Sequence, residues 1–413
     1  MKRQRAFVSG IVVAALFSLA GAVHAQAPGD PVPGQYIVVL RAGANPVAVA
    51  NRHGAAAEHV YSAALNGFVG AVPAGRLRAL LRDPQVAWVE QDQVVTAFGK
   101  PVPPQPAQTV PTGVLRANAD LNLTAKIDGI DERVNADIAI IDTGIQLNHP
   151  DLNVVRNVSF VNRIKTGNDD HGHGTHVAGT AAALDNGIGV VGVAPGARLW
   201  AVKVLDRNGS GTMSGVIKGV DYVTANAASI EVANMSLGGA NSGTLNTAIA
   251  NSVAKGVVYA VAAGNSSADA VNTSPANSPV VLCVSAIVDT DGQCGGLGGS
   301  TSYGADDTRA SFSNFGSVVD IAAPGVNILS TGIGSTYVGG WSGTSMASPH
   351  VAGAVALYLA THLKPINAPG AAAVRDAIIA AGVAQNASCA DPIGGFTGDS
   401  DGYPEKLLNA MGL

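Results

Sequence analysis

The sequence predicts an α/β protein, with a large domain built on a mostly parallel sheet that has helices on both faces and a small α+β domain before it. From about residue 114 onward, nearly continuous apolar segments alternate with helical stretches, which is typical of a parallel sheet covered on both sides. Residues 35–96 show a shorter pattern of their own, and a proline-rich stretch separates the two regions. A chain of 413 residues is long enough for both domains.

The expected elements of the small domain alternate between extended and helical segments. The strands are expected at 36–40, 67–72 and 86–90, and the helices at 46–54 and 74–83. This order, in which the chain returns through a second helix to a last strand, predicts a small α+β sandwich.

The expected strands of the large domain are apolar runs that suit a sheet buried on both faces. They span residues 136–142, 198–205, 229–237, 256–263 and 280–287. The expected helices span residues 175–184, 214–227, 244–255, 346–363 and 370–381. Ligands of such folds bind at the carboxyl ends of the strands, so residues that follow a strand are the first candidates for chemistry.

The N-terminus has the pattern of a secretory signal peptide. Basic residues at the start precede an apolar run over about 11–23, and small residues follow. The run is shorter than the roughly 20 residues of a membrane span, so we expect cleavage after Ala25 and a secreted protein without stable membrane association.

The proline-rich stretch predicts a linker. Residues 98–113 contain five prolines, which oppose regular structure and favour an exposed, easily cut segment. The expected division is a signal peptide at 1–25, a first domain at 26–98, a linker at 99–113 and a large domain at 114–413.

Composition excludes one class of partner. Charged residues make up 13% of the chain and the net charge is −5, with no Lys- or Arg-rich stripe. Nucleic acid is therefore not expected to bind, since its recognition needs a basic surface. We expect a monomer.

Three cysteines allow at most one internal disulfide, and export permits it. Cys283 and Cys294 are the pair closest in sequence, so they are the expected bridge, with Cys389 unassigned. No spacing resembles a zinc framework.

Four polar residues in the large domain form a catalytic pattern. Asp142 ends an apolar strand, His173 lies in "GHGTHVAG", and Ser345 precedes an Ala-rich helical run. These supply a carboxylate, a base and a nucleophile. Asn265, just beyond another strand, offers an amide that would hold a tetrahedral oxyanion together with the Ser345 N–H.

Five motifs in this order resemble the subtilisin family of serine endopeptidases. They are "IIDTGIQLNHPDL", "HGTHVAGT", "NMSLGG", "AAGN" and "GTSMASPHVAG", and the likeness covers roughly 114–385. The order Asp, His, Ser is the subtilisin order. By this resemblance Asp142 orients His173, His173 is the general base, Ser345 attacks and Asn265 stabilises the oxyanion.

The resemblance also implies a mode of substrate binding and an inhibitor. Protein and peptide substrates would add a strand to the backbone of the substrate-binding segments. The implied substrate-binding residues are Ser210, Gly211, Ser236, Leu237, Gly238 and Gly264. Residues 35–98 resemble the inhibitory propeptide of the family, which would act on its own catalytic domain until it is cut off by self-processing between Thr96 and Pro111.

The resemblance further implies structural calcium. The segment "AALDNGIGVVG" at 182–192 is similar to the calcium loop of the family. The implied ligands are Asp151, the Leu184 carbonyl, the Asn186 side chain and the carbonyls of Ile188 and Val190, all oxygen donors of the kind calcium prefers. "DTDG" at 289–292 and "DSDG" at 399–402 have calcium-like spacing as well as the composition of ordinary Asp/Gly turns.

Two other functions fit parts of the sequence. A zinc hydrolase would use His171, His173 and His176, but HEXXH is absent. A secreted binding protein could keep the fold without the chemistry, although every catalytic position holds a competent residue.

Overall fold

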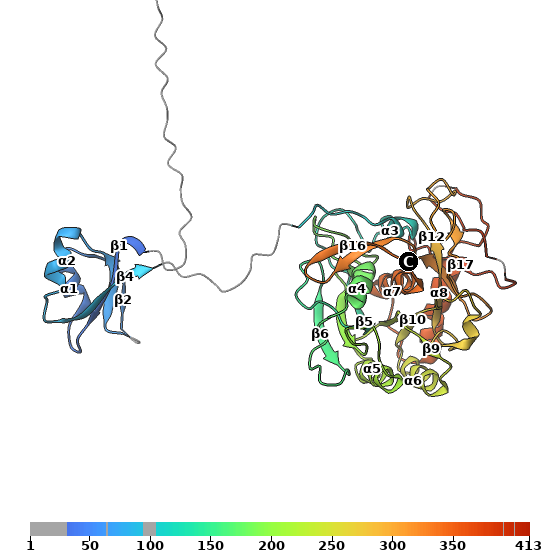
Figure 1. Ribbon diagram of the computed structural model, residues 1–413, viewed down its shortest axis with the longest axis horizontal. Coiled ribbons are helices and arrows are strands. Elements are labelled where there is room, and N and C mark those ends of the chain that lie inside the picture. Colours follow the sequence, from blue (N-terminus) through green and yellow to red (C-terminus); the bar gives the residue numbers. More distant parts are fainter. Residues whose placement is uncertain (1–30, 63–64, 94–104, 391, 400) are drawn as a thin grey trace, which may run out of the picture. The chain divides into compact units, whose positions relative to one another are not determined.

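The computed structural model describes residues 31–62, 65–93, 105–390, 392–399 and 401–413 (Figure 1). The chain forms two compact units, Met1–Pro101 and Val102–Leu413. The predicted signal peptide at 1–25 lies outside the described residues. So do residue 96, where the predicted self-processing region begins, and the first part of the predicted linker, 99–104.

The first unit is a four-stranded antiparallel sheet with two helices. The sheet order is β2-β3-β1-β4. The strands are β1 (Pro31–Leu40), β2 (Ala56–Tyr61), β3 (Gly67–Ala71) and β4 (Val86–Gln93), and the helices are α1 (Pro46–Arg52) and α2 (Ala74–Leu80). Val38, Val49, Phe68 and Leu80 share one buried core, so both helices cover the same face of the sheet. The sequence predicted every element here except β2, whose residues are largely exposed.

The second unit is built on a sheet whose main path has the order β17-β14-β12-β10-β8-β5-β7-β6, with all neighbours on that path parallel. Its strands are β5 (Asp137–Asp142), β6 (Val154–Ser159), β7 (Arg198–Lys203), β8 (Val232–Met235), β10 (Val258–Ala262), β12 (Leu282–Val288), β14 (Ile321–Pro324) and β17 (Lys406–Leu407). β13 (Thr308–Arg309) joins β12 antiparallel. Shorter ribbons pair β9 (Gly239–Ala240) with β11 (Thr273–Ser274), and β15 (Ile328–Gly332) with β16 (Thr336–Trp341).

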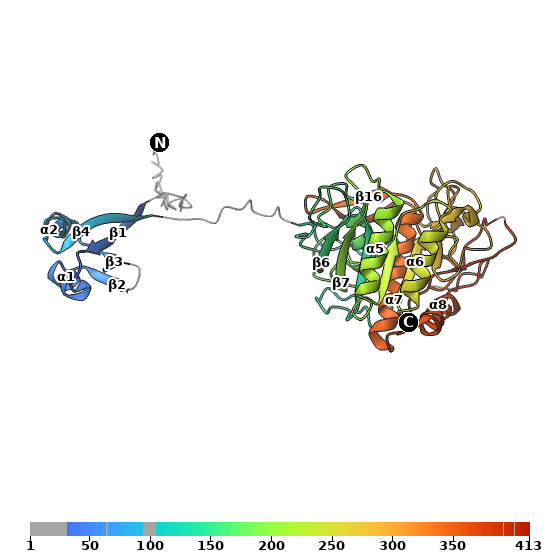
Figure 2. The same cartoon turned by 90° about the horizontal axis from the view of Figure 1, so that it is seen from below.

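Helices cover both faces of this sheet (Figures 1 and 2). α4 (His173–Ala182) and α7 (Thr344–Thr361) pack against each other on one face. α5 (Met213–Ala225), α6 (Gly243–Val253) and α8 (Ala368–Ala381) lie on the other. Two short helical turns, α3 (Thr112–Arg116) and η1 (Ala270–Asn272), complete the unit. The predicted α/β architecture is confirmed.

On the main path of the sheet, the sequence missed β6 and β17 at the two ends and β14 next to β17. β6 is largely exposed and therefore lacks the continuous apolar run that marked the central strands. β14 and β17 are short, at four and two residues. By contrast, every residue of β5, β10 and β12 is buried, which is why those runs were readable.

The predicted Cys283–Cys294 bridge is wrong. Cys294 is bonded to Cys389, 95 residues away, and Cys283 is a free, buried cysteine. The physical reason is that Cys283 lies inside β12, where its side chain is fully enclosed in the core, whereas Cys294 lies in the loop after that strand. Proximity in sequence therefore did not bring the two sulfur atoms together.

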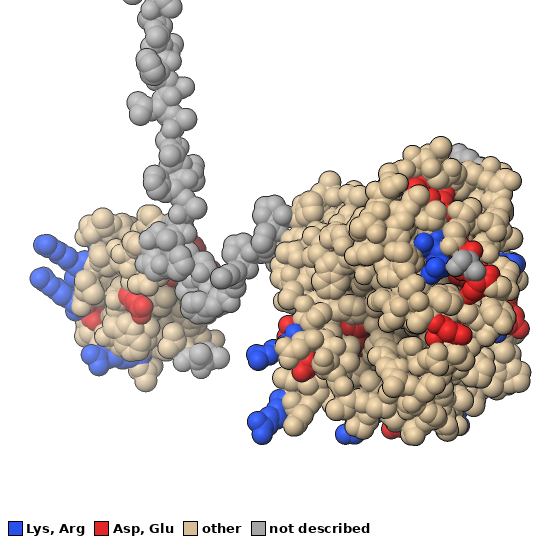
Figure 3. Space-filling model, turned by 45° about the vertical axis from the view of Figure 1, so that its right-hand side comes forward, with Lys and Arg blue, Asp and Glu red and all other residues tan. Residues whose placement is uncertain are grey.

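Charged side chains are sparse on the face of the second unit shown in Figure 3, which is dominated by neutral residues. This agrees with the low charged fraction of the chain. Within the described part of the chain, none of the helices is both long enough and apolar enough to span a bilayer.

Candidate active site

Asp142 is the last residue of β5 and is fully buried. Its Oδ1 accepts a hydrogen bond from the Thr143 N–H at 2.6 Å and lies 2.7 Å from His173 Nδ1. Gly174 lets the helix approach this closely, because a Cβ there would stand 2.1 Å from the Gly144 carbonyl oxygen. A buried carboxylate is costly unless it is paired, and the imidazole supplies that partner.

His173 is the first residue of α4, and Asp169 holds the start of that helix. One Asp169 oxygen accepts from the N–H groups of His171 and Gly172, and the other accepts from the N–H and hydroxyl of Thr175. A carboxylate at a helix start satisfies N–H groups that have no intrahelical partner. The ring of His173 is thereby fixed over the end of β5.

The pKa of His173 is raised above its ordinary value of 6.5. Burial opposes the charged form, but the charge and hydrogen bond of Asp142 together outweigh it, and the Asp169 carboxylate adds to the effect. The site therefore stabilises a proton on this imidazole.

Ser345 is the second residue of α7, directly after the Gly343–Thr344 start of the helix. Its Oγ donates to the Ser236 carbonyl at 3.2 Å. The Ser236 hydroxyl in turn donates to the Ser345 carbonyl at 2.7 Å and lies 2.9 Å from Ser348 Oγ. These contacts join the start of α7 to the segment after β8.

Asn265 follows β10 and has a defined amide orientation. Its Oδ1 accepts from the Thr344 N–H at 2.8 Å and from the Thr344 hydroxyl at 2.9 Å. Since both of these are donors, the oxygen must face Thr344 and the NH₂ group is left to donate elsewhere. Asn265 and Ser345 line the same pocket, so the amide and the hydroxyl open onto one space.

Two pockets adjoin these side chains and share Leu237 and Gly238. One, of about 520 Å³, includes His173; the other, of about 400 Å³, includes Ser345 and Asn265. The predicted substrate-binding residues all line one or both: Ser210, Gly211, Ser236, Leu237, Gly238 and Gly264. The Ser236 hydroxyl nevertheless points inward to α7, which leaves its backbone as the part that faces the pocket.

The three clustered histidines have separate environments. His173 Nδ1 contacts Asp142, while His176 Nε2 lies 3.1 Å and 3.2 Å from the carbonyl oxygens of Ile328 and Val338. Burial lowers the pKa of His176 to about 4, and its ring stacks on Trp341 at 5.0 Å. His171 Nδ1 accepts from the His173 N–H at 3.3 Å, so the three histidines have different contacts, which does not match the convergent ligands of a zinc site.

The predicted calcium loop contains a buried carboxylate oxygen without a partner. Asp151 is fully buried; its Oδ2 accepts from the Val190 N–H, but its Oδ1 has no hydrogen-bond partner. Burial raises the pKa of Asp151 to about 7. In the described part of the chain, no backbone N–H is hydrogen-bonded to the carbonyl oxygens of Leu184, Ile188 or Val190. Unsatisfied oxygen donors of this kind suit a hard cation such as calcium.

Several supporting residues were not predicted. Gln108 Oε1 accepts from the Asn186 and Gly187 N–H groups, so the end of the predicted linker contacts the predicted calcium loop. No local pattern in a proline-rich stretch signals such a contact. Lys203 is fully buried and donates to Asp170 and to the Thr143 carbonyl, next to Asp142. Asp169 lies three residues before the Gly172 N-cap of α4, so the usual preference for Asp at the cap itself did not indicate it.

Comparison with known proteins gives two family matches and many relatives. Residues 135–394 match the model described as the subtilase family, and residues 35–98 match the model described as peptidase inhibitor I9. Subtilisin NAT from Bacillus subtilis subsp. natto is 42% identical over 291 residues, covering 69% of this chain and 68% of the relative. A thermostable alkaline protease from Halalkalibacterium halodurans is 43% identical over 282 residues, covering 68% and 69%.

A solved structure shares the fold of the large unit. The crystal structure of a cold adapted subtilisin-like serine proteinase matches with a TM-score of 0.53 and 36% sequence identity. The match covers 70% of this chain and 98% of the other.

Proposed function

Because the chain belongs to the subtilase family of serine peptidases and carries a peptidase inhibitor I9 domain, we propose that it hydrolyses peptide bonds through an acyl-enzyme on Ser345. The observation that carries this proposal is the 2.7 Å contact between His173 and a buried carboxylate, beside the pocket that Ser345 lines. A nucleophile, a base and a group that orients the base are the minimum set for acyl transfer by serine.

The proposed reaction moves one proton back and forth through His173. The Nε2 atom of the neutral ring takes the proton of the Ser345 hydroxyl as Oγ attacks the peptide carbonyl. Asp142 keeps the other nitrogen protonated and stabilises the imidazolium. His173 then gives the proton to the leaving amine, and the cycle repeats with water as the nucleophile. Before attack, the Ser345 hydroxyl must turn from the Ser236 carbonyl toward His173.

The proposed oxyanion site combines two donors. The Asn265 amide is oriented by Thr344, and the Ser345 N–H lies in the first turn of α7, where N–H groups have no intrahelical partner. Both are in place before charge develops, so stabilising the tetrahedral oxyanion needs little reorganisation.

Replacing Asn265 with alanine is expected to lower kcat by about 10²–10³, the range known for loss of one such donor in subtilisin. KM should change little, because the lost hydrogen bond forms in the transition state. Steady-state kinetics on a peptide amide measure this. Asn272→Ala in the same pocket is the matched control; an equal loss in both variants would show that the pocket, and not the oxyanion donor, was damaged.

Substrates are proposed to bind as an added strand beside the backbone at 236–238, with Ser210 and Gly211 on the opposite side of the groove. Leu237 and Gly264 would border the side chain that precedes the cut. We also propose residues 26–98 as an intramolecular inhibitor that is released by self-processing between Thr96 and Pro111. A secreted, monomeric enzyme is proposed on the basis of the N-terminal pattern and the family.

The test of this function is hydrolysis of denatured casein by the purified protein together with covalent labelling by a serine-directed phosphonate. Labelling at Ser345 that parallels the loss of casein hydrolysis is the expected result. A protein that binds unfolded chains without turnover would instead support the binding-protein alternative. Activity that only zinc restores after chelation would support the zinc hydrolase.

Calcium is proposed to bind at Asp151, Leu184, Asn186, Ile188 and Val190, where it would neutralise the Asp151 carboxylate and stabilise the fold. Asp151→Asn is expected to reduce the difference between the melting temperatures measured with calcium and with chelator. A site with free calcium at a hundred times Kd contributes about 2.7 kcal/mol. Asp376→Asn, at an exposed side chain on α8, is the control; an unchanged calcium effect in Asp151→Asn would contradict the assignment.

A further inference from the structure

We propose that Asp289, Asp291 and Asp306 bind a second calcium ion, in the loop that follows β12. This site is separate from the loop at 184–190 and from the catalytic groups. It uses the "DTDG" segment together with a carboxylate that lies fifteen residues beyond Asp291 in the sequence.

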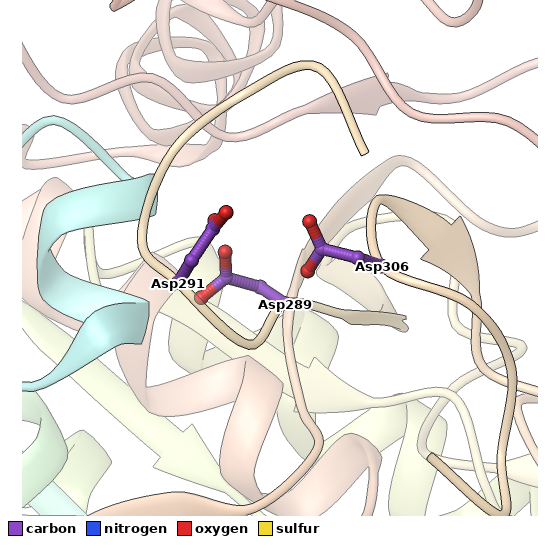
Figure 4. Close-up of side chains that lie close together, drawn as sticks. All are labelled: Asp289, Asp291 and Asp306. Carbon is purple, nitrogen blue, oxygen red and sulfur yellow. The ribbon is translucent and has the colours of Figure 1, made fainter. Parts of the chain in front are cut away.

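The three carboxylates converge from two ends of one loop. Asp289 follows β12 directly, and Asp306 lies just before β13. One oxygen from each of the three can be chosen so that all lie within 4.8 Å of one another. Figure 4 shows the three carboxyl groups turned toward a shared space.

Asp289 supplies an independent sign of a missing positive partner. The residue is 1% exposed, and its Oδ2 is buried without any hydrogen-bond partner. Its Oδ1 accepts from the Gly292 N–H at 3.0 Å. Buried polar atoms in folded proteins are nearly always satisfied, and an orphan carboxylate oxygen costs more than a neutral one. A cation in the shared space would satisfy it.

Arg116, the cation whose charge acts on Asp289, already has its own hydrogen-bond partners. Arg116 Nε donates to Asp307 Oδ1 at 2.7 Å, and its Nη2 donates to the carbonyls of Gly394 and Gly395. The other Asp307 oxygen accepts from the Gly295 and Gly296 N–H groups. Arg116 and Asp307 therefore neutralise each other, and the three carboxylates are left with an excess of negative charge.

The electrostatics of Asp289 agree with this geometry. Burial raises its pKa to about 7, and the Asp306 carboxylate adds to the rise. Arg116, the Gly292 N–H and the Thr112 hydroxyl offset this only in part. A divalent cation would instead hold all three groups in their charged form.

The donor set favours calcium over other metals. Carboxylate oxygens suit hard cations, whereas zinc in proteins is bound mainly through Cys and His. Calcium binds oxygen at 2.3–2.6 Å, so oxygens opposite each other on the ion are up to about 5.2 Å apart; for magnesium the limit is about 4.2 Å. The three ligand oxygens lie within 4.8 Å of one another, a separation that one calcium ion can bridge. Asp291 is half-exposed, which leaves room for water to complete the coordination.

The loop is already held in place around the proposed site. Asp306 accepts from the N–H and hydroxyl of Thr290 and from the Gly298 N–H. A carboxylate offers about four acceptor positions, so capacity for a cation remains. The Cys294–Cys389 disulfide ties the same loop to the C-terminal region. Calcium and the disulfide would therefore stabilise the same segment.

The experiment uses the full chain with Ser345→Ala, to prevent self-digestion, and Asp151→Asn, to remove the other proposed site. Calcium binding to this parent is measured by calorimetric titration after chelator treatment. One ion per chain is expected, and adding Asp291→Asn should raise the Kd at least ten-fold. Asp376→Asn should leave it unchanged. No binding by the parent, or equal Kd values with and without Asp291→Asn, would overturn the proposal.

Thermal unfolding gives a second readout, because the difference in melting temperature between parent and variant should depend on whether calcium is present. In chelator, Asp289→Asn should melt at the same or a higher temperature than the parent, because it removes a buried charge that has no partner. With calcium added, the parent should melt higher than the variant. Magnesium at the same concentration should give a smaller rise than calcium. Identical calcium responses in parent and variant would overturn the site, and an equal response to magnesium would overturn its assignment to calcium.

Discussion

Replacing Ser345 with alanine is expected to lower kcat for peptide hydrolysis by about a million-fold, the size of the loss known for the nucleophile of subtilisin. The reason is that no acyl-enzyme can form without the hydroxyl, so His173 has no serine proton to take and Asp142 no imidazolium to stabilise. A residual rate about 10³–10⁴ above that of water should remain from binding and the oxyanion donors. Single-turnover kinetics on an activated peptide substrate measure it.

The Ser345→Ala variant also tests the proposed maturation. It should keep the inhibitor domain attached, since self-processing needs the same nucleophile, so its kinetics are measured after cleavage by a trace of wild-type enzyme. Ser342→Ala is the control, because it removes a nearby serine hydroxyl that accepts from the Asn327 N–H and has no part in the proposed chemistry. This variant should mature, and its kcat should stay within a few-fold of the wild-type value. Continued self-cleavage of Ser345→Ala, with its residual activity well above trace contamination, would refute the mechanism.

Replacing Asp142 with asparagine is expected to lower kcat by about 10⁴, as the equivalent change does in trypsin-like enzymes. The shape of the side chain is kept, but the amide no longer stabilises the imidazolium and favours the wrong tautomer of His173. The loss should be far greater than that from Asp221→Asn on the exposed side of α5, which removes the same charge without touching the site.

The pH profile of Asp142→Asn gives a second readout. The base must be neutral to act, so kcat/KM should rise with pH through the pKa of His173, which lies above 6.5 in the wild-type site. Since Asp142 raises that pKa, the variant's acid limb should move to lower pH. His176 and His350 have pKa values lowered to about 4 and stay neutral across this range. An unmoved acid limb would show that Asp142 does not act on His173.

Much of the fold could be predicted because its signals are local. The runs around β5, β10 and β12 are apolar because both faces of those strands are covered. The helices between them are indicated by apolar residues that recur every three or four positions. Edge strands such as β6 lack that signal because water covers much of their surface. The catalytic roles stay predictions. The expected partners Asp142 and His173 do meet, because Asp142 ends β5 and His173 begins α4 at the same carboxyl edge of the sheet.

What the sequence by itself determined is therefore the α/β architecture, the family and the chemical types present at the candidate site. The tertiary structure decided which distant groups meet: Cys294 with Cys389 in place of Cys283, Asn265 with Thr344, and Asp289 with Asp306. The physical reason is that periodicity records which side of an element faces the core. Which loops meet depends on packing between segments that are far apart in the chain, and a local sequence pattern does not predict that packing.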